Sequence, residues 1–185
     1  ETMCMEADPD TVQRGVHVIV NETERLSEMV EELLDFSRMQ NSHFSLQFAP
    51  MDVLAELGEA VLIYAERAKT EDVTVTYEEP EMLPIVYGDK NRIKQVFINI
   101  IDNAIKYSNK GGTVKIVAGT SAEGDIKITV KDNGCGITKE DLPHIFERFY
   151  HGKNSSSESV GIGLALAKTV LEKEKGDIIV NSELG

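Results

Sequence analysis

Several features that would place the chain in a familiar class are absent from its sequence. Only Cys4 and Cys135 are cysteines among 185 residues, and they lie far apart in no metal-like spacing, which fits reduced thiols in a cytoplasm better than a disulfide framework. No stretch approaches the roughly 18 consecutive apolar residues of a membrane span, and the chain does not open with a basic stretch followed by an apolar run. The chain as given is therefore expected to be soluble and cytoplasmic.

Positive charge is scarce as well. The sequence has 19 Lys and Arg against 32 Asp and Glu, a formal net charge of −13 at pH 7. This argues against a general nucleic-acid binder, because phosphate backbones require clustered Lys and Arg. The segment from Glu1 to Gln40 holds ten acidic residues, three arginines and no lysine. More than half of the net charge therefore lies there, where it is expected to form the solvated face of a helix.

The same segment predicts a long helix with one apolar seam. Asp8-Pro-Asp10-Thr11 supplies capping groups. Apolar or small residues then recur in alternating steps of three and four, which is the spacing of a coiled coil: Val16, Ile19, Thr23, Leu26, Val30, Leu33 and Ser37. Such a seam needs a partner helix.

The remainder of the chain predicts a mixture of helices and strands. Asp52 and Asp89 are expected to cap two further helices, and Thr138 to Asp141 resembles a capping box before a short one. Alternating or turn-bounded stretches predict strands, and a glycine-bounded stretch predicts a closing helix. These are strands at 73–77, 113–118, 125–132 and 177–181, and a helix at 161–175.

The helix after Asp89 has an unusual polar face. Its apolar residues recur at helical spacing and predict a buried stripe: Ile93, Val96, Phe97, Ile100, Ile101, Ala104 and Ile105. The opposite stripe carries Arg92, Gln95, Asn99, Asn103 and Lys106. Asparagine is a mediocre helix former, so a face that only meets solvent would favour Glu, Lys or Gln. Two asparagines one turn apart therefore suggest ligands.

Two glycine-bearing segments suggest backbone that approaches a ligand. Asp132-Asn-Gly-Cys-Gly136 follows a predicted strand directly, and Gly161-Ile-Gly163 opens a predicted helix whose N–H groups could meet an anion. Either segment alone is equally explained as an ordinary turn or a flexible helix entry. Between them stand Phe146 to Tyr150 and a polar Gly/Ser run, 151–159, which predicts a mobile loop.

In this order and spacing, the segments resemble the N, G1, F and G2 boxes of sensor histidine kinases, within the fold family shared with gyrase, Hsp90 and MutL ATPases. The resemblance runs from about Asn21 to Gly185, and Leu33 to Arg38 matches the second helix of the dimerisation and phosphoacceptor hairpin. It implies an α+β fold, a two-layer sandwich of a mixed sheet with three helices on one face, preceded by a long helix from an incomplete hairpin. Residues 1–43 would belong to the hairpin and 44–185 to the ATP-binding domain, whose last strand would be truncated.

Carried over residue by residue, the resemblance implies a site for ATP or ADP with Mg²⁺. Asn103 would be the Mg²⁺ ligand, and Asn99 and Lys106 would act on the phosphates in catalysis. Tyr107 would pack on the adenine, and Asp132 would accept a hydrogen bond from its amino group. The full set of nucleotide-binding residues would be Asn99, Asn103, Lys106, Tyr107, Asp132, Gly134, Gly136, Ile137, Phe149, Lys153, Gly161, Gly163 and Leu164.

Two positions depart from the family's pattern, and a third distinguishes the chain from the hydrolytic relatives. His151 stands where Arg is usual, and Ser159 replaces the first glycine of the last box. Asn99 occupies the place of the general-base glutamate of the hydrolytic relatives, so attack of water on ATP should be slow. Arg148 or Lys153 could compensate for His151 by supplying permanent positive charge.

The resemblance also sets expectations about the parent protein. It would transfer the γ-phosphoryl group to a histidine and then to a response-regulator aspartate, as a homodimer in an inner or plasma membrane with this part in the cytoplasm. None of His17, His43, His144 and His151 has the context of an acceptor, so this chain should bind ATP without autophosphorylating. Two alternatives remain: an ATPase with a chaperone or topoisomerase role, and a non-catalytic docking module.

Overall fold

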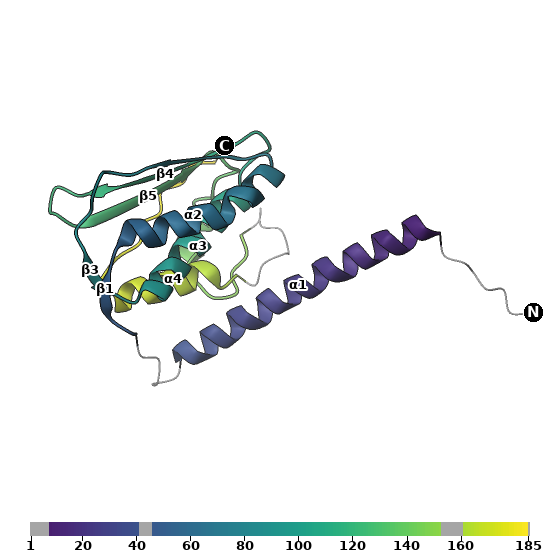
Figure 1. Cartoon of the computed structure of the whole chain (residues 1–185), viewed down its shortest axis with the longest axis horizontal. Coiled ribbons are helices and arrows are strands. Elements are labelled where there is room, and N and C mark those ends of the chain that lie inside the picture. Colours follow the sequence, from purple (N-terminus) through teal and green to yellow (C-terminus); the bar gives the residue numbers. More distant parts are fainter. Residues whose placement is uncertain (1–7, 41–45, 153–160, 185) are drawn as a thin grey trace, which may run out of the picture.

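The computed structural model describes residues 8–40, 46–152 and 161–184. The predicted first helix is α1, Pro9–Gln40. The Asp8 carbonyl accepts hydrogen bonds from the N–H groups of Thr11 and Val12 at 2.9 and 3.0 Å, so the helix starts within the segment of predicted capping residues. Figure 1 shows α1 as a rod that extends away from the rest of the molecule. No helix within the described residues is long and apolar enough to cross a bilayer.

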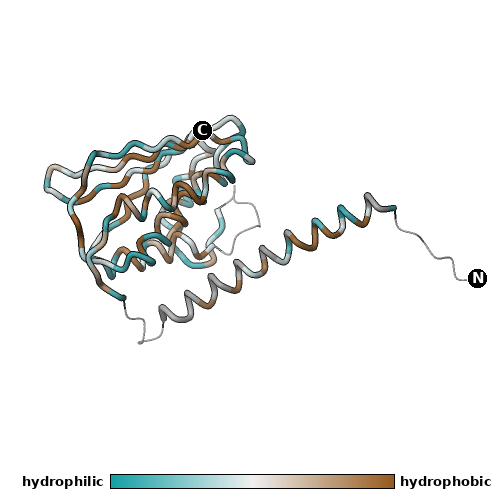
Figure 2. Tube along the Cα trace, viewed as in Figure 1, coloured by the Kyte–Doolittle hydropathy of each residue, from teal (hydrophilic) through white to brown (hydrophobic). Residues whose placement is uncertain are grey.

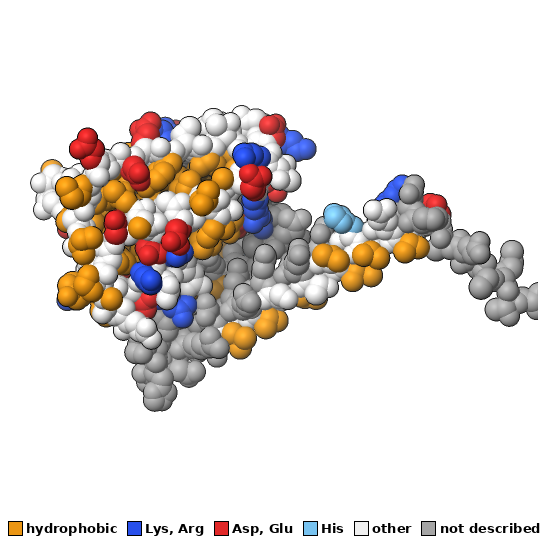
Figure 3. Space-filling view, viewed as in Figure 1, with side chains coloured by type: hydrophobic (Ala, Val, Ile, Leu, Met, Phe, Trp, Pro, Cys, Tyr) orange, Lys and Arg blue, Asp and Glu red, His pale blue; other side chains and the backbone are white. Residues whose placement is uncertain are grey.

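The apolar seam of α1 faces solvent. Val16, Ile19, Leu26 and Val30 are each more than half exposed, and Figure 3 shows hydrophobic side chains along one edge of the rod. The structure does not describe the side chains of Leu33 and Ser37, so these two members of the predicted seam are not placed. The described part of the seam has the exposed apolar surface that calls for a partner helix.

The rest of the chain forms a two-layer sandwich. Its sheet has the order β2 (Thr74–Glu78), β4 (Thr113–Thr120), β5 (Ile126–Asp132). Strand β2 runs parallel to β4 and β5 antiparallel, so the sheet is mixed. Three helices cover one face of it (Figure 1): α2 (Val53–Thr70), α3 (Lys90–Lys106) and α4 (Gly163–Lys173). The α+β fold predicted from the resemblance is confirmed.

The core lies between the sheet and α2 and α3. Strand β4 buries alternate residues, Val114, Ile116 and Ala118, against Leu57 of α2 and Ile101 of α3. A second cluster joins α3 to α4 through Val96, Ile162, Leu166 and Val170. In Figure 2 hydrophobic stretches of the trace recur along the helices and strands of the sandwich. Because α3 packs on both sides, its polar stripe is held at a fixed angle to the start of α4.

The two predicted aspartate caps are confirmed. The Asp52 carboxylate accepts hydrogen bonds from the N–H groups of Leu54 and Ala55 at 3.0 and 3.4 Å. Asp89 does the same for Asn91 and Arg92 at 3.1 and 3.3 Å. Each oxygen satisfies donors that the first helical turn leaves without an intrahelical partner.

Two predicted elements differ from the structure, and one observed element was not predicted. The predicted strand at 177–181 has irregular backbone, because a short apolar run marks a possible strand but cannot supply a partner in register. A two-stranded ribbon of β1 (Ala49–Met51) and β3 (Val86–Gly88) is an additional element that the strand patterns did not indicate, because both strands are only three residues long. The capping box at Thr138 leads into a single 3₁₀ turn, Leu142–His144, and not an α-helix.

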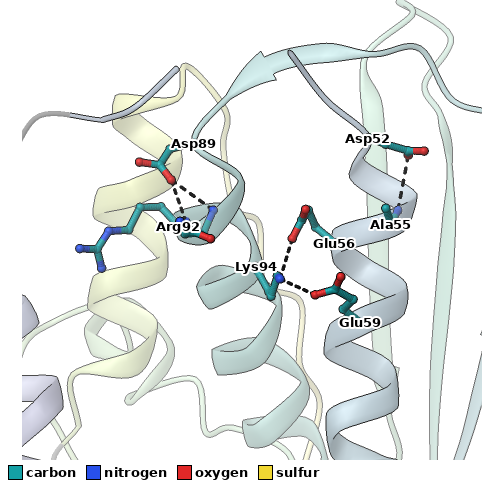
Figure 4. A network of polar contacts seen from close by, with 8 residues as sticks. Asp52, Ala55, Glu56, Glu59, Asp89, Arg92 and Lys94 are labelled. Atoms are coloured by element: carbon teal, nitrogen blue, oxygen red, sulfur yellow. Dashed lines mark hydrogen bonds and ion pairs between the residues drawn. The ribbon is translucent and has the colours of Figure 1, made fainter. Parts of the chain in front are cut away.

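A partly buried ion cluster joins α2 to α3. Lys94 Nζ lies 3.0 Å from Glu56 Oε2 and also bonds Glu59 (Figure 4). The hydrogen bond from Lys94 lowers the pKa of the Glu59 carboxyl, and the bonds to Glu59 and Glu56 raise the pKa of Lys94. The stabilisation from a lowered carboxyl pKa is present above the ordinary value of 4.5 and is lost as the pH falls through the lowered pKa. The stabilisation from the raised pKa of Lys94 is present below the ordinary value of 10.5 and is lost as the pH rises through the raised pKa.

Replacing Lys94 with methionine should therefore lower the urea midpoint near neutral pH by on the order of half a molar, because Glu56 is left with little solvent and no cation. The difference from the unmodified chain should vanish in strongly acidic solution. Lys69→Met is the matched control, since Lys69 and Glu66 form an exposed pair on one helix, and it should leave the midpoint unchanged. Equal shifts for both variants would contradict the prediction.

Candidate functional site

The polar stripe of α3 lies at the helix surface as predicted. Asn99, Asn103 and Lys106 are partly exposed, while the apolar stripe behind them is mostly buried. The Asn99 amide Nδ2 donates a hydrogen bond of 3.1 Å to the carbonyl of Gly163, the first residue of α4. Lys106 Nζ lies 5.9 Å from the centre of the Tyr107 ring. In the described part of the chain, the Asn103 side-chain amide has no hydrogen-bond partner and is available to a ligand.

The turn after β5 presses against the C-terminal end of α3. The Cys135 N–H donates to the Tyr107 carbonyl at 3.2 Å. A Cβ on Gly134 would lie only 2.2 Å from that same carbonyl oxygen, so this position requires glycine. Asp132 Oδ1 accepts a hydrogen bond from the Gly134 N–H at 3.0 Å, which fixes the carboxylate beside the turn. The two segments predicted to share a ligand are therefore adjacent.

The other side of this turn meets the C-terminal segment. Gly136 has a φ of +70°, and a Cβ there would lie 2.0 Å from the carbonyl oxygen of Glu183. The next residue, Ile137, donates its N–H to Ser182 Oγ at 2.9 Å. Residues 182–184 thus take part in holding the turn, although they form no strand.

The base of the polar loop is closed by backbone contacts. The Phe149 N–H donates to the Gly161 carbonyl at 3.0 Å, and both residues have positive φ angles of 59° and 73°. Positive φ is uncommon in residues other than glycine, so the surrounding structure must hold Phe149 there. Its side chain is 53% exposed. Lys153 lies outside the described residues, so its predicted phosphate contact is not placed.

A buried carboxylate anchors the segment before this loop. Asp141 is 7% exposed and accepts a 2.7 Å hydrogen bond from the Tyr150 hydroxyl. This hydrogen bond raises the pKa of Tyr150, because the neutral phenol is the donor. The Asp141 N–H in turn donates to Thr138 Oγ1 at 3.0 Å. The sequence marked Thr138 and Asp141 only as a capping box, and their role in positioning Tyr150 was missed.

The first turn of α4 completes the arrangement. Gly163 and Leu164 begin the helix, and a Cβ on Gly163 would meet the Asn99 side chain at 3.6 to 3.8 Å. A helix N-terminus presents unpaired N–H groups and a positive dipole end, which favours an anion. Asn99 therefore stands directly beside a place suited to phosphate.

The side chains near this site suit a metal ion that binds together with a nucleotide phosphate. No group of three or more His, Cys, Asp or Glu side chains within the described ranges could hold a metal ion. Mg²⁺ keeps several waters and is commonly bound by one or two protein oxygens together with nucleotide phosphates. One amide oxygen on Asn103, one helical turn from Asn99, is sufficient for that mode.

Comparisons with known proteins agree with this geometry. The family described as histidine kinase-, DNA gyrase B-, and HSP90-like ATPase matches residues 88–185. Sensor-like histidine kinase SenX3 from Mycolicibacterium smegmatis is 33% identical over 96% of this chain, which covers 47% of that protein. The chain spans less than half of the length of the curated relatives it matches.

Two solved structures are similar over more than nine tenths of the chain. Full-length ShkA in complex with AMPPNP gives a TM-score of 0.78 at 26% identity, covering 94% of this chain and 36% of that one. Histidine kinase ThkA in complex with the response regulator protein TrrA gives 0.70 at 26% identity, covering 91% and 46%.

Proposed function

This chain belongs to the histidine kinase-, DNA gyrase B- and HSP90-like ATPase family, and we propose that it binds Mg-ATP between α3, the turn after β5 and the start of α4. In this proposal it is the nucleotide-binding part of a sensor histidine kinase. The observation that carries it is the 3.1 Å hydrogen bond from Asn99 to the Gly163 carbonyl, which joins two motifs 64 residues apart. The complex of ShkA with AMPPNP supports the same ligand class.

Different residues of the site would bind the phosphates, the metal ion and the base. The N–H groups of Gly163 and Leu164 and the ammonium group of Lys106 would bind phosphates, and Asn103 would supply an amide oxygen to Mg²⁺. Bound Mg²⁺ would neutralise phosphate charge. The Asp132 carboxylate would accept from the adenine amino group, next to the ring of Tyr107. Gly134, Gly136 and Ile137 would line the base side, and Phe149, Lys153 and Gly161 would belong to a lid over the phosphates.

For the parent protein, we propose transfer of the γ-phosphoryl group to a histidine and then to a response-regulator aspartate. The ThkA–TrrA complex is support for such a partner. Catalysis would consist mainly of positioning and charge neutralisation by Asn99 and Lys106. An asparagine at 99 offers no general base for water, so hydrolysis would be slow. The exposed seam of α1, in residues 1–43, would pair in a homodimer.

Titration of the chain with Mg-ATP tests the proposal. Saturable binding is expected, with ADP competing for the same site and GTP binding at least about tenfold more weakly, because guanine presents a carbonyl where adenine has its amino group. Isothermal calorimetry or a fluorescent nucleotide analogue would measure it. Absence of saturable binding at millimolar Mg-ATP would leave only the docking-module alternative.

A further inference from the structure

A buried carboxylate ties the segment after α1 to the start of α3. Asp89 is 8% exposed and lies between β3 and α3. Its Oδ1 accepts from the N–H groups of Asn91 and Arg92 in the helix cap (Figure 4). Its Oδ2 accepts a 2.9 Å hydrogen bond from the N–H of Gln47, in the stretch between α1 and β1. The two oxygens of this carboxylate therefore bind two different segments: Oδ1 binds the start of α3, and Oδ2 binds Gln47.

The end of α4 is bound to the same residue. The Asp89 N–H donates to Glu174 Oε1 at 2.9 Å, and Glu174 is the C-terminal cap of α4. Its second oxygen packs closely on Gly88, where a Cβ would come within 3.0 Å. Asp89 is therefore a junction between three segments that are far apart in the sequence.

Helices α3 and α4 are consequently joined at two places. One is the bond from Asp89 to Glu174, and the other is the bond from Asn99 to Gly163 at the proposed phosphate site. A hydrophobic cluster that includes Val96 and Val170 lies between the two helices. A close-packed interface of this kind has low compressibility and transmits strain, so we expect the two helices to shift together. A shift of this pair on binding a nucleotide would therefore act on the Gln47 N–H through Asp89 Oδ2.

We infer that Asp89 is a positioning residue that couples the segment after α1 to the α3–α4 pair, so that nucleotide binding and the attachment of this segment influence each other. The inference rests on the proposed nucleotide site. Coupling of this kind is reciprocal: the factor by which the nucleotide strengthens the Gln47 bond equals the factor by which that bond strengthens nucleotide binding. For a residue with only a structural role both factors equal one, so Mg-ATP would leave the Gln47 bond unchanged.

The variant Asp89→Asn is expected to keep the cap of α3 and to remove the hydrogen bond to Gln47. Asparagine caps helices as well as aspartate, so its single oxygen can keep the Asn91 and Arg92 bonds. Its NH₂ group then faces the Gln47 N–H, and two donors cannot bond. Asp52→Asn is the matched control, because Asp52 caps α2 through one oxygen in the same way and makes no described bond to the segment after α1.

Amide hydrogen exchange at Gln47, with and without Mg-ATP, is the measurement. In the unmodified chain and in Asp52→Asn, Mg-ATP should slow exchange at Gln47. In Asp89→Asn, the exchange rate at Gln47 should rise about tenfold and should no longer change when Mg-ATP is added. The affinity of this variant for Mg-ATP should also fall. The expected factor is the one by which Mg-ATP slows Gln47 exchange in the unmodified chain. Glu174→Ala should also uncouple Gln47 without touching the α3 cap, and Glu174→Gln, which keeps an acceptor oxygen, should restore the response.

Two results would overturn the inference while leaving the proposed function intact. One is Mg-ATP binding with no change in Gln47 exchange in the unmodified chain, and the other is a nucleotide response that persists in Asp89→Asn. Failure of the unmodified chain to bind Mg-ATP would instead refute the proposed function, and the coupling with it.

Discussion

Alanine in place of Gly134 is expected to weaken Mg-ATP binding by at least about tenfold and to destabilise the fold by about 1–3 kcal/mol. The new Cβ would lie 2.2 Å from the Tyr107 carbonyl oxygen and 2.8 Å from its carbon. Both are backbone atoms at the end of α3, so no side-chain rotation relieves the overlap. The turn must move away from the helix and carries with it Asp132, whose Oδ1 bonds the Gly134 N–H.

Gly119→Ala is the matched control for this variant. Gly119 lies in β4, and a Cβ there has no atom within 4 Å. Alanine also has fewer unfolded conformations than glycine, so stability should stay the same or rise by a few tenths of a kcal/mol. Binding should match the unmodified chain, as measured by calorimetry and urea unfolding. If Gly134→Ala binds as tightly as Gly119→Ala, the turn is not part of the site.

Local rules were enough to predict the elements that position the site. Asp52 and Asp89 cap their helices as their side-chain chemistry requires, and the buried stripe of α3 follows the 3.6-residue period. The asparagines stood out because a solvated face has no need of them, and the structure places them at the helix surface with Asn99 bonded to α4. Residues that break a local preference are the ones that sequence reasoning detects best.

Contacts between distant segments could not be predicted in the same way. Nothing in the residue types joins Ile137 to Ser182, or Asp89 to Gln47 and Glu174, because a backbone N–H and a carboxylate have many equivalent partners in the chain. The segment 177–181 is a short apolar run and β5 alternates, yet of these two predicted strands only β5 gained a partner in register, β4. Such pairings are settled by packing of the whole sandwich and not by local pattern.

Asn103→Ala should separate a ligand role from a structural one. The variant is expected to bind Mg-ATP at least about tenfold more weakly, because Mg²⁺ would lose the amide oxygen that the site offers it. The difference should disappear when both chains bind ATP in EDTA, since the metal is then removed from each. Affinity that is unchanged in the presence of Mg²⁺ would refute the metal role of Asn103.

The same substitution should leave the nucleotide-free chain as stable or more so. Asn103 lies inside α3, its amide has no hydrogen-bond partner among the described residues, and alanine is the better helix former by up to about 0.7 kcal/mol. Asn91→Ala, at an exposed position in the first turn of the same helix, is the control and should leave binding unaltered. A side chain whose removal stabilises the free protein and weakens the complex is kept for its ligand, since the fold gains nothing from it. If Asn103→Ala lowers the urea midpoint of the free chain, its amide serves the fold, and weaker binding would then follow from lost structure.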